Sequence, residues 1–441
     1  MKPMNLMNRV SALAGSAMIV ALAGACNPDL NVTNPNAPDV SRAITSGADV
    51  RQLIGSSYNT WFLGMQGCLN QCEPYTGIAT GVMADNMTMA FGNYGARFNG
   101  QEPRLAFNNS SANADGRVAS ESWDGMYSAL GAANDGLSAI GRGVRVAKSP
   151  SDEDETEAFK SFAYLVQGNT MGYIGLVFDR GFVVTEETDP TTNQLQPYAA
   201  VSAAALASYD KAIALATGKD WVIEADFTGG VEMTADRVAR TANTMAARQL
   251  AYTPRNATET AAVDWARVLS YADKGISTGS APFTLQINGD GGNLWYDMTK
   301  GYVERAGSWA RLDQRVVQLA DPSQPVVYTS TTPPPFPTIA DLRFAHGTPD
   351  ANGDIKQAGA DFWFVQTIPF DPARGTYFFS QWAPVRYFSH SWSSPAPFTG
   401  TVPYVLAAEN DLLIAEALVR TGGDKARAAS LINKTRGGRG G

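Results

Sequence analysis

Tryptophan and tyrosine side chains gather between residues 280 and 400, next to side chains that can form hydrogen bonds. Sugar rings present apolar C–H faces bordered by hydroxyl groups, so exposed aromatic rings flanked by amide, carboxylate or guanidinium groups suit them. The candidate ligand contacts of this window are Trp295, Tyr296, Trp363, Trp382, Trp392, Asn293 and Arg386. A single tryptophan is more often buried than exposed. With five tryptophans in the window, Trp309 included, we predict that two or more are exposed platforms.

Acidic residues of the same window allow two further kinds of chemistry. Asp350, Asn352 and Asp354 alternate like the oxygen ligands of a calcium loop, but Ile355 stands where the EF-hand pattern has glycine. An Asx-rich surface turn therefore fits better than a metal site. Glycoside hydrolysis would need two paired carboxylates. No pattern brings two acids together, and we expect surface positions for Asp297, Glu304, Asp313 and Asp361.

The N-terminal segment has the layout of an export signal. A basic start is followed by a short apolar run over 12–23 and small residues before Cys26, and the run is too short to span a membrane. The stretch Leu22-Ala23-Gly24-Ala25-Cys26 resembles a bacterial lipobox, in which the cysteine becomes the lipid-modified N-terminus. We predict a signal peptide over 1–25 and acyl chains such as palmitate on Cys26. The alternative is an ordinary signal peptide.

Residues 26–40 are rich in Asn, Pro and Asp, which predicts a polar tether rather than a packed element. Export also bears on the remaining two cysteines. Cys68 and Cys72 could form a local disulfide in an oxidising compartment, although spacing alone does not establish the geometry. Two cysteines without a nearby histidine make a poor zinc site.

Apolar residues recur at helical spacing through most of the chain, which predicts a mostly α-helical protein. The predicted helices cover 41–63, 117–140, 151–178, 199–216, 233–252, 264–276, 402–419 and 425–436, with a further apolar stretch at 75–89. Within the 402–419 segment, the predicted packing stripe is Val405, Ala408, Leu412, Ala415 and Val419. Short strands are predicted at 362–365 and 377–379.

Small residues at helical spacing in the segments near 199–216 and 264–276 let neighbouring helices approach closely. Paired helices of this kind resemble tetratricopeptide hairpins, but the strict 34-residue period is absent. Residues 280–400 differ, because they are rich in proline and aromatic residues and form a long insertion. The predicted fold is therefore a single domain over 41–441, built of irregular tetratricopeptide-like hairpins with a loop-rich insertion.

Composition excludes several classes of protein. The 441 residues include 44% hydrophobic residues, enough for a large core, which excludes intrinsic disorder. The net charge of −8 argues against nucleic acid as a partner. With only His346 and His390 in the chain, a histidine-based metal site has little to build on.

The run Ala408 to Arg436 resembles the SusD/RagB family, in which a helix with an A-E-A-L-x-R-x-G-like end meets an A-x-x-x-I-N-x-x-R helix. The lipobox, the tether, the small-residue helices and the aromatic insertion occur in the order the family shows. The resemblance implies a lipoprotein of the outer membrane facing the exterior, without a cofactor or catalytic centre. Such proteins capture glycans or other nutrients and cover a SusC-like TonB-dependent transporter.

The resemblance also places polar ligand contacts in the N-terminal loops, at Asp85, Asn86 and Arg97. The sequence departs from the family pattern at its C-terminal end, because family members continue where this chain stops at Gly441. We therefore expect a truncated or divergent C-terminus. Starch, another glycan, a glycopeptide or a peptide would suit the predicted contacts. The alternatives are a surface glycoside hydrolase and a tetratricopeptide-like scaffold that binds a protein.

Overall fold

The computed structural model describes residues 44, 46–66, 75–89, 99, 106–108, 110, 112–113, 116–189, 191–277, 283–287, 295, 310–326, 336, 339–367, 378, 380–388 and 399–436. The chain divides into two units, Met1–Ala43 and Ile44–Gly441, and every described residue belongs to the second. The predicted signal peptide, the tether, Cys26, Cys68 and Cys72 lie outside the described residues.

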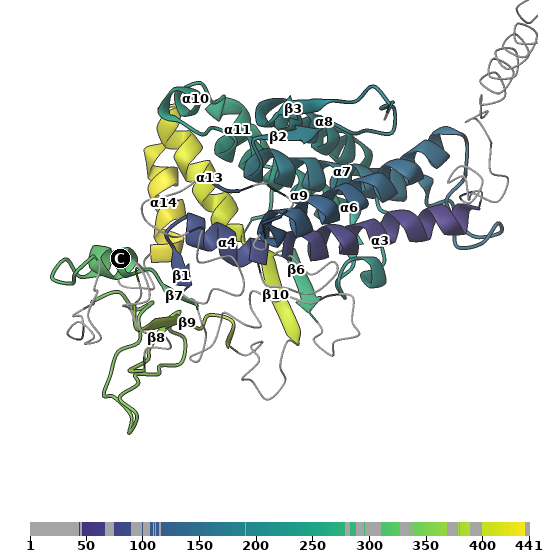
Figure 1. Ribbon diagram of the computed structural model, residues 1–441. Helices are drawn as coiled ribbons and strands as arrows, with labels where there is room; N and C mark the ends of the chain where they lie inside the picture. The colour runs from purple at the N-terminus through teal and green to yellow at the C-terminus, as the bar shows by residue number, and fades with distance from the viewer. Residues whose placement is uncertain are drawn as a thin grey trace, which may run out of the picture. The chain divides into compact units, whose positions relative to one another are not determined.

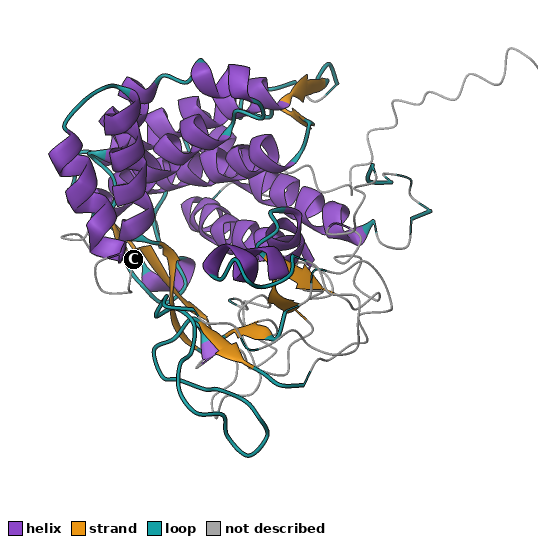
Figure 2. Ribbon diagram, turned by 90° about the vertical axis from the view of Figure 1, so that its left-hand side faces the viewer, coloured by secondary structure: helices purple, strands orange, loops and turns teal. Residues whose placement is uncertain are grey.

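Helices make up most of the described structure, and the strands are short segments among loops (Figure 2). The helices are α3 (Gly47–Gln66), α4 (Tyr75–Met83), α6 (Arg117–Gly141), α7 (Thr156–Val177), α8 (Tyr198–Ala216), α9 (Ala235–Tyr252), α10 (Ala257–Ala261), α11 (Trp265–Ala272), α12 (Gln314–Ala320), α13 (Ala407–Arg420) and α14 (Lys425–Arg436), with a 3-10 turn η2 at Ala225–Phe227. The predicted mostly α-helical fold is confirmed.

The strands pair only in twos, and each pair is antiparallel. The pairs are β1 (Met87–Met89) with β7 (Ala310–Leu312), β2 (Arg180–Phe182) with β3 (Leu195–Pro197), β4 (Val222–Ile223) with β5 (Met233–Thr234), β6 (Phe283–Ile287) with β10 (Gly400–Val405), and β8 (Phe362–Phe364) with β9 (Trp382–Pro384). The strand predicted at 362–365 is confirmed by β8. The one predicted at 377–379 lies largely outside the described residues.

The large helices pack in series, α3 on α6, α6 on α7, α7 on α8 and α8 on α9 (Figure 1). Their facing side chains form the main hydrophobic core, which includes Tyr58, Phe162 and Tyr209. Helices α3 and α6 cross in close backbone contact. A Cβ atom added to Gly125 of α6 would lie 2.4 Å from the Cα of Gly64 in α3, so only glycine fits there.

Helix α8 is long and apolar enough to cross a membrane, judged by length and composition alone. It lies instead among the other helices, in contact with both α7 and α9. Val201, Ala205 and Ala212 of this helix are fully buried in the main core. The apolar character of α8 is thus that of a core helix.

The packing stripe predicted within 402–419 is correct for Ala415, which is buried, but wrong for Leu412 and Val419. Leu412 and Val419 are 43% and 57% exposed, and Val405 belongs to strand β10 rather than to α13. The buried face of α13 instead carries Leu413, Ile414, Ala415, Ala417 and Leu418. Helices α9, α11 and α14 contact α13, and this set of neighbours decides which residues are buried. Helix α14 matches the predicted 425–436 at both ends.

The insertion has a hydrophobic core of its own, separate from the main one. This insertion core consists of Leu312, Val317, Ile339, Phe344, Ala345, Ile355, Ala360, Phe364 and Trp382. Its residues come from β7, α12, β8, β9 and the loops that join them. Some aromatic residues of 310–388 are therefore buried and stabilise the insertion itself.

Candidate functional site

The pairing of β1 with β7 brings the N-terminal loop residues Asp85 and Asn86 to the insertion. Met87 lies opposite Leu312 in this pair, and the N–H of Asp313 donates to the carbonyl of Asn86 at 3.1 Å. The segment that carries the predicted contacts Asp85 and Asn86 thus meets the insertion at β7 and Asp313. Arg97, the third predicted residue of these loops, lies outside the described residues.

Asp85 ends helix α4 in a left-handed conformation, with φ of 57°. The N–H of Asn86 donates to Gly81 and the N–H of Asp85 donates to Val82, which is the Schellman pattern of a helix C-terminus. Glycine is usual at this position, and aspartate tolerates it better than most residues. The side chain that replaces glycine here has a partner, namely Arg315.

Arg315 holds two carboxylates at once, and we call Asp85, Asp313, Arg315 and Phe378 the Arg315 clamp. Its Nη2 lies 2.6 Å from Asp85 Oδ1, and its Nε lies 2.9 Å from Asp313 Oδ1. The guanidinium carbon lies 3.8 Å from the centre of the Phe378 ring. Asp313 also caps α12 by accepting the N–H of Arg315 at 2.8 Å.

The Asp313 side chain is only 2% exposed. Burial raises its pKa above the ordinary value, and the hydrogen bonds from Arg315 oppose that rise. Removing one partner of a buried ion pair costs about 3–5 kcal/mol, because the other charge stays buried. The prediction that Asp313 is a surface acid is therefore wrong, and Arg315 is needed to keep this carboxylate inside.

The β8–β9 hairpin has two aromatic faces, since side chains alternate along a strand. Phe364 and Trp382 point into the insertion core. The other side, which we call the Trp363 face, consists of the buried residues Val365, Ala383 and Val385 with the partly buried rings of Trp363 and Phe388 packed against them, and Trp363 also packs against the insertion core. Trp363 is partly buried, its Nε1 donates to the carbonyl of Gln357 at 2.9 Å, and its ring lies 4.9 Å from that of Phe388.

Charged groups border the Trp363 face. Arg386 donates from Nη2 to Asp361 Oδ2 at 2.6 Å, and half of the Arg386 side chain is exposed while Asp361 is buried. Arg343 lies next to this pair, because its carbonyl accepts the N–H of Asp361 at 2.8 Å. Its own guanidinium binds Asp341, with Nε 2.8 Å from Oδ2. The prediction of a surface position is thus wrong for Asp361 as well.

Two of the predicted aromatic contacts are buried, so the prediction of an exposed platform is wrong for them. Trp295 is 6% exposed and packs in the main core, 5.3 Å from the ring of Phe62. Trp382 is 2% exposed and packs edge-on against Phe344 at 4.9 Å. Tyr296, Trp309, Trp392 and Asn293 lie outside the described residues, and the prediction stands there as made.

The Asp350 loop is closed by a lysine. Asp350 Oδ1 accepts the N–H groups of Asn352 and Asp354, as in an Asx turn. Lys356 Nζ lies 3.0 Å from Asp350 and 2.9 Å from Asp354, so its ammonium group takes the position between the two carboxylates. Within the described ranges, no cluster of three or more His, Cys, Asp or Glu side chains could hold a metal ion.

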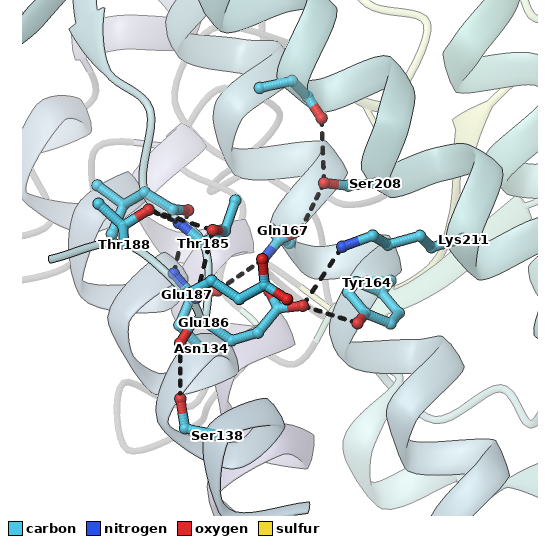
Figure 3. A network of polar contacts seen from close by, with 12 residues as sticks. Asn134, Ser138, Tyr164, Gln167, Thr185, Glu186, Glu187, Thr188, Ser208 and Lys211 are labelled. Carbon is cyan, nitrogen blue, oxygen red and sulfur yellow. Dashed lines mark hydrogen bonds and ion pairs between the residues drawn. The ribbon is translucent and has the colours of Figure 1, made fainter. Parts of the chain in front are cut away.

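A second polar cluster lies among the helices and centres on Glu186, in the loop between β2 and β3 (Figure 3). Its carboxylate accepts hydrogen bonds from Tyr164 at 2.8 Å and Gln167 at 3.0 Å, and Lys211 lies 3.3 Å away. Gln167 also accepts from Ser208 at 2.5 Å. Hydrogen bonds and one ion pair among these side chains connect α6, α7 and α8 with the loop after β2. The cluster therefore stabilises the packing of these elements.

No protein-family model and no curated protein matches the sequence, but solved structures match its fold. A SusD superfamily protein from Bacteroides thetaiotaomicron gives a TM-score of 0.56 at 13% identity, over 90% of this chain and 81% of that one. Surface glycan-binding protein A from Bacteroides uniformis gives 0.57 at 14%, over 88% and 80%. A SusD/RagB family protein from B. thetaiotaomicron gives 0.54 at 18%, over 87% and 70%. This chain has the SusD fold.

The resemblance inferred from residues 408–436 is thereby confirmed at the level of the fold. The matches cover 87–90% of this chain, so they extend well beyond residues 408–436. Because the sequence identities are only 13–18%, the shared fold does not identify the ligand, which must be inferred from the residues of this chain.

Sequence reasoning missed several residues of the site. Phe336 is 49% exposed and lies 5.0 Å from Phe364 and 6.0 Å from Trp382, so it covers the insertion core with an exposed ring. The sequence around Arg315 does not indicate its role, because that role depends on Asp85, which is 230 residues away. The spacing of Asp361 and Trp363 on one strand face could have been noticed, since period-two alternation is a local signal.

Proposed function

We propose that this protein is a non-catalytic glycan-binding lipoprotein of the cell surface, and that it passes its cargo to a SusC-like TonB-dependent transporter. The observation that carries the proposal is the Trp363 face, where a partly exposed indole lies on the hairpin that holds the Arg386–Asp361 pair. The similarity in fold to a surface glycan-binding protein supports it. Anchoring through acylated Cys26 follows from the lipobox, and the transporter follows from the family resemblance.

The chemistry of the Trp363 face suits a sugar. The indole offers an apolar surface, and the bond from its Nε1 to Gln357 holds the ring in one orientation. The exposed Arg386 guanidinium offers donors for hydroxyl groups. Stacking combined with a few hydrogen bonds gives a wet contact of modest affinity.

The test is a calorimetric or fluorescence binding screen of the full mature chain against soluble oligosaccharides. Trp363→Ala should weaken binding of the best ligand by about tenfold or more, a loss of about 1.4 kcal/mol. The matched control is Tyr252→Ala, which removes an aromatic residue that is 47% exposed at the end of α9, away from the hairpin. This variant should bind as the wild type does.

Wild-type protein that binds no oligosaccharide, or a Trp363→Ala variant with unchanged affinity, would contradict the proposal. Reducing ends released from a polysaccharide panel by the purified protein would favour a glycoside hydrolase instead. Co-purification under mild detergent tests the transporter separately, because glycan binding does not require it.

A further inference from the structure

Four basic side chains of the insertion form ion pairs with aspartates in the part of the chain that the structure describes, while a fifth, Arg311, is buried and donates to the carbonyl of Ala310. Arg315, Arg343, Lys356 and Arg386 reach solvent to between 25% and 53% of their side chains. Each forms an ion pair. The carboxylates concerned are Asp85 and Asp313 for Arg315, Asp341 for Arg343, Asp350 and Asp354 for Lys356, and Asp361 for Arg386. Within these ion pairs, four cations face six carboxylates.

Two of these arginines cannot bind a charged ligand without weakening their ion pairs with buried aspartates. Asp313 and Asp361 have side chains that are 2% and 5% exposed, and Arg315 and Arg386 neutralise them. A ligand carboxylate or sulfate bound to Arg386 would place a second negative charge beside buried Asp361. It would either repel that carboxylate or leave it without its counter-charge. The hydroxyl groups of a neutral sugar demand no such exchange, since they donate and accept without carrying charge.

We infer that the glycan taken by the Trp363 face is neutral, and that glycans with uronate or sulfate groups are rejected. This inference rests on the proposed function and narrows it to a class of substrate. The paired aspartates act as specificity determinants, because they cancel the positive charge that would attract an anion. Arg386 then serves as a hydrogen-bond donor whose charge is already compensated.

The first experiment is a binding array of neutral, uronate-containing and sulfated oligosaccharides, probed with the full mature chain. Hits confined to neutral glycans, with affinity independent of salt, would support the inference. A uronate or sulfated glycan as the tightest ligand would overturn it and leave the proposed function intact. An array without any hit would overturn the proposed function itself, and the inference with it.

The second experiment removes the negative charge of Asp361 that compensates the positive charge of Arg386. Asp361→Asn removes the carboxylate that pairs with Arg386, and the affinity for an oligogalacturonate at low salt should rise by about tenfold or more. The control is Asp236→Asn, which releases Arg240 from an exposed pair on α9 and should leave oligogalacturonate binding unchanged. Thermal melting shows whether the variants fold. A folded Asp361→Asn variant that gains no uronate affinity would overturn the role assigned to Asp361.

Discussion

Asp85 of the candidate site has two structural roles, one for its backbone and one for its side chain. Its backbone closes helix α4 in a conformation that glycine would adopt more easily, while its carboxylate binds Arg315 at 2.6 Å. Glycine would serve the helix end but not the clamp. The aspartate at this position is therefore explained by the contact with the insertion rather than by the helix it ends.

Glu186 provides a pH-dependent test at the scale of one residue. Burial alone would raise its pKa, but hydrogen bonds from Gln167 and Tyr164 and the charge of Lys211 lower it below the ordinary value of 4.5. A carboxyl whose pKa is lowered by folding stabilises the protein above the unfolded pKa, and that contribution disappears as pH falls through the folded value. Glu186→Gln should lower the free energy of unfolding at neutral pH, and the deficit should shrink below pH 4.5.

Urea unfolding of both proteins over a pH series measures this difference. The exposed Glu232, directly before β5, offers a matched control, and Glu232→Gln should leave the unfolding free energy nearly unchanged. A deficit for Glu186→Gln that stays constant from neutral to acidic pH would show that the charge of Glu186 contributes nothing.

Which residues are buried could not be predicted at the residue scale, even where the residue types could. Trp382 and Trp363 belong to strands of the same hairpin, yet the first is sealed in the insertion core while the second is partly exposed. Phe344, from a loop outside the hairpin, and Phe364, opposite Trp382 on the paired strand β8, pack against Trp382. Such neighbours are not visible in a local sequence window.

At the scale of elements, the crossing of α3 and α6 depends on two glycines in direct backbone contact. Gly125→Ala places a methyl group against the Cα of Gly64, and no flexible side chain can move out of its way. Overpacking of this kind costs about 1–3 kcal/mol. We expect a lower unfolding free energy by about that amount in chemical denaturation.

Gly131→Ala is the matched control on the same helix, because an added methyl group there meets nothing within 4 Å. This variant should be stabilised by about 0.5–1 kcal/mol, since alanine favours the helix over glycine. Equal effects of the two substitutions would mean that the crossing is looser than the structure has it.

Helices were the predictable elements, because their apolar period is local. Residues 117–140 were predicted for what is α6 at Arg117–Gly141. Short strands were less accessible: the apolar stretch at 75–89 resolves into α4 and the three-residue β1. Residues 402–405 were assigned to a helix but form the end of β10, whose partner β6 lies more than a hundred residues earlier. Pairing over such distances leaves no trace in the local pattern.

At the scale of the whole molecule, attachment to a membrane is the property to test. Cys26→Ala should abolish acylation and shift the protein from the membrane fraction to the soluble fraction of a bacterial host that matures lipoproteins. Mass spectrometry of the N-terminal peptide, together with fractionation, measures both. Cys68→Ala is the control and should remain membrane-bound. A wild-type protein that is found unmodified at Cys26 would refute the proposed anchor.

The Arg315 clamp has a consequence for the order in which the chain folds. Asp85 and Arg315 are 230 residues apart, whereas successive helices such as α7 and α8 are neighbours along the chain. Closing long loops is entropically slow, and topologies with distant contacts fold late. We expect the helical hairpins to assemble first and the contact between Asp85 and Arg315 to form last. A nascent polypeptide would then join α4 to the insertion only after most of its length had emerged.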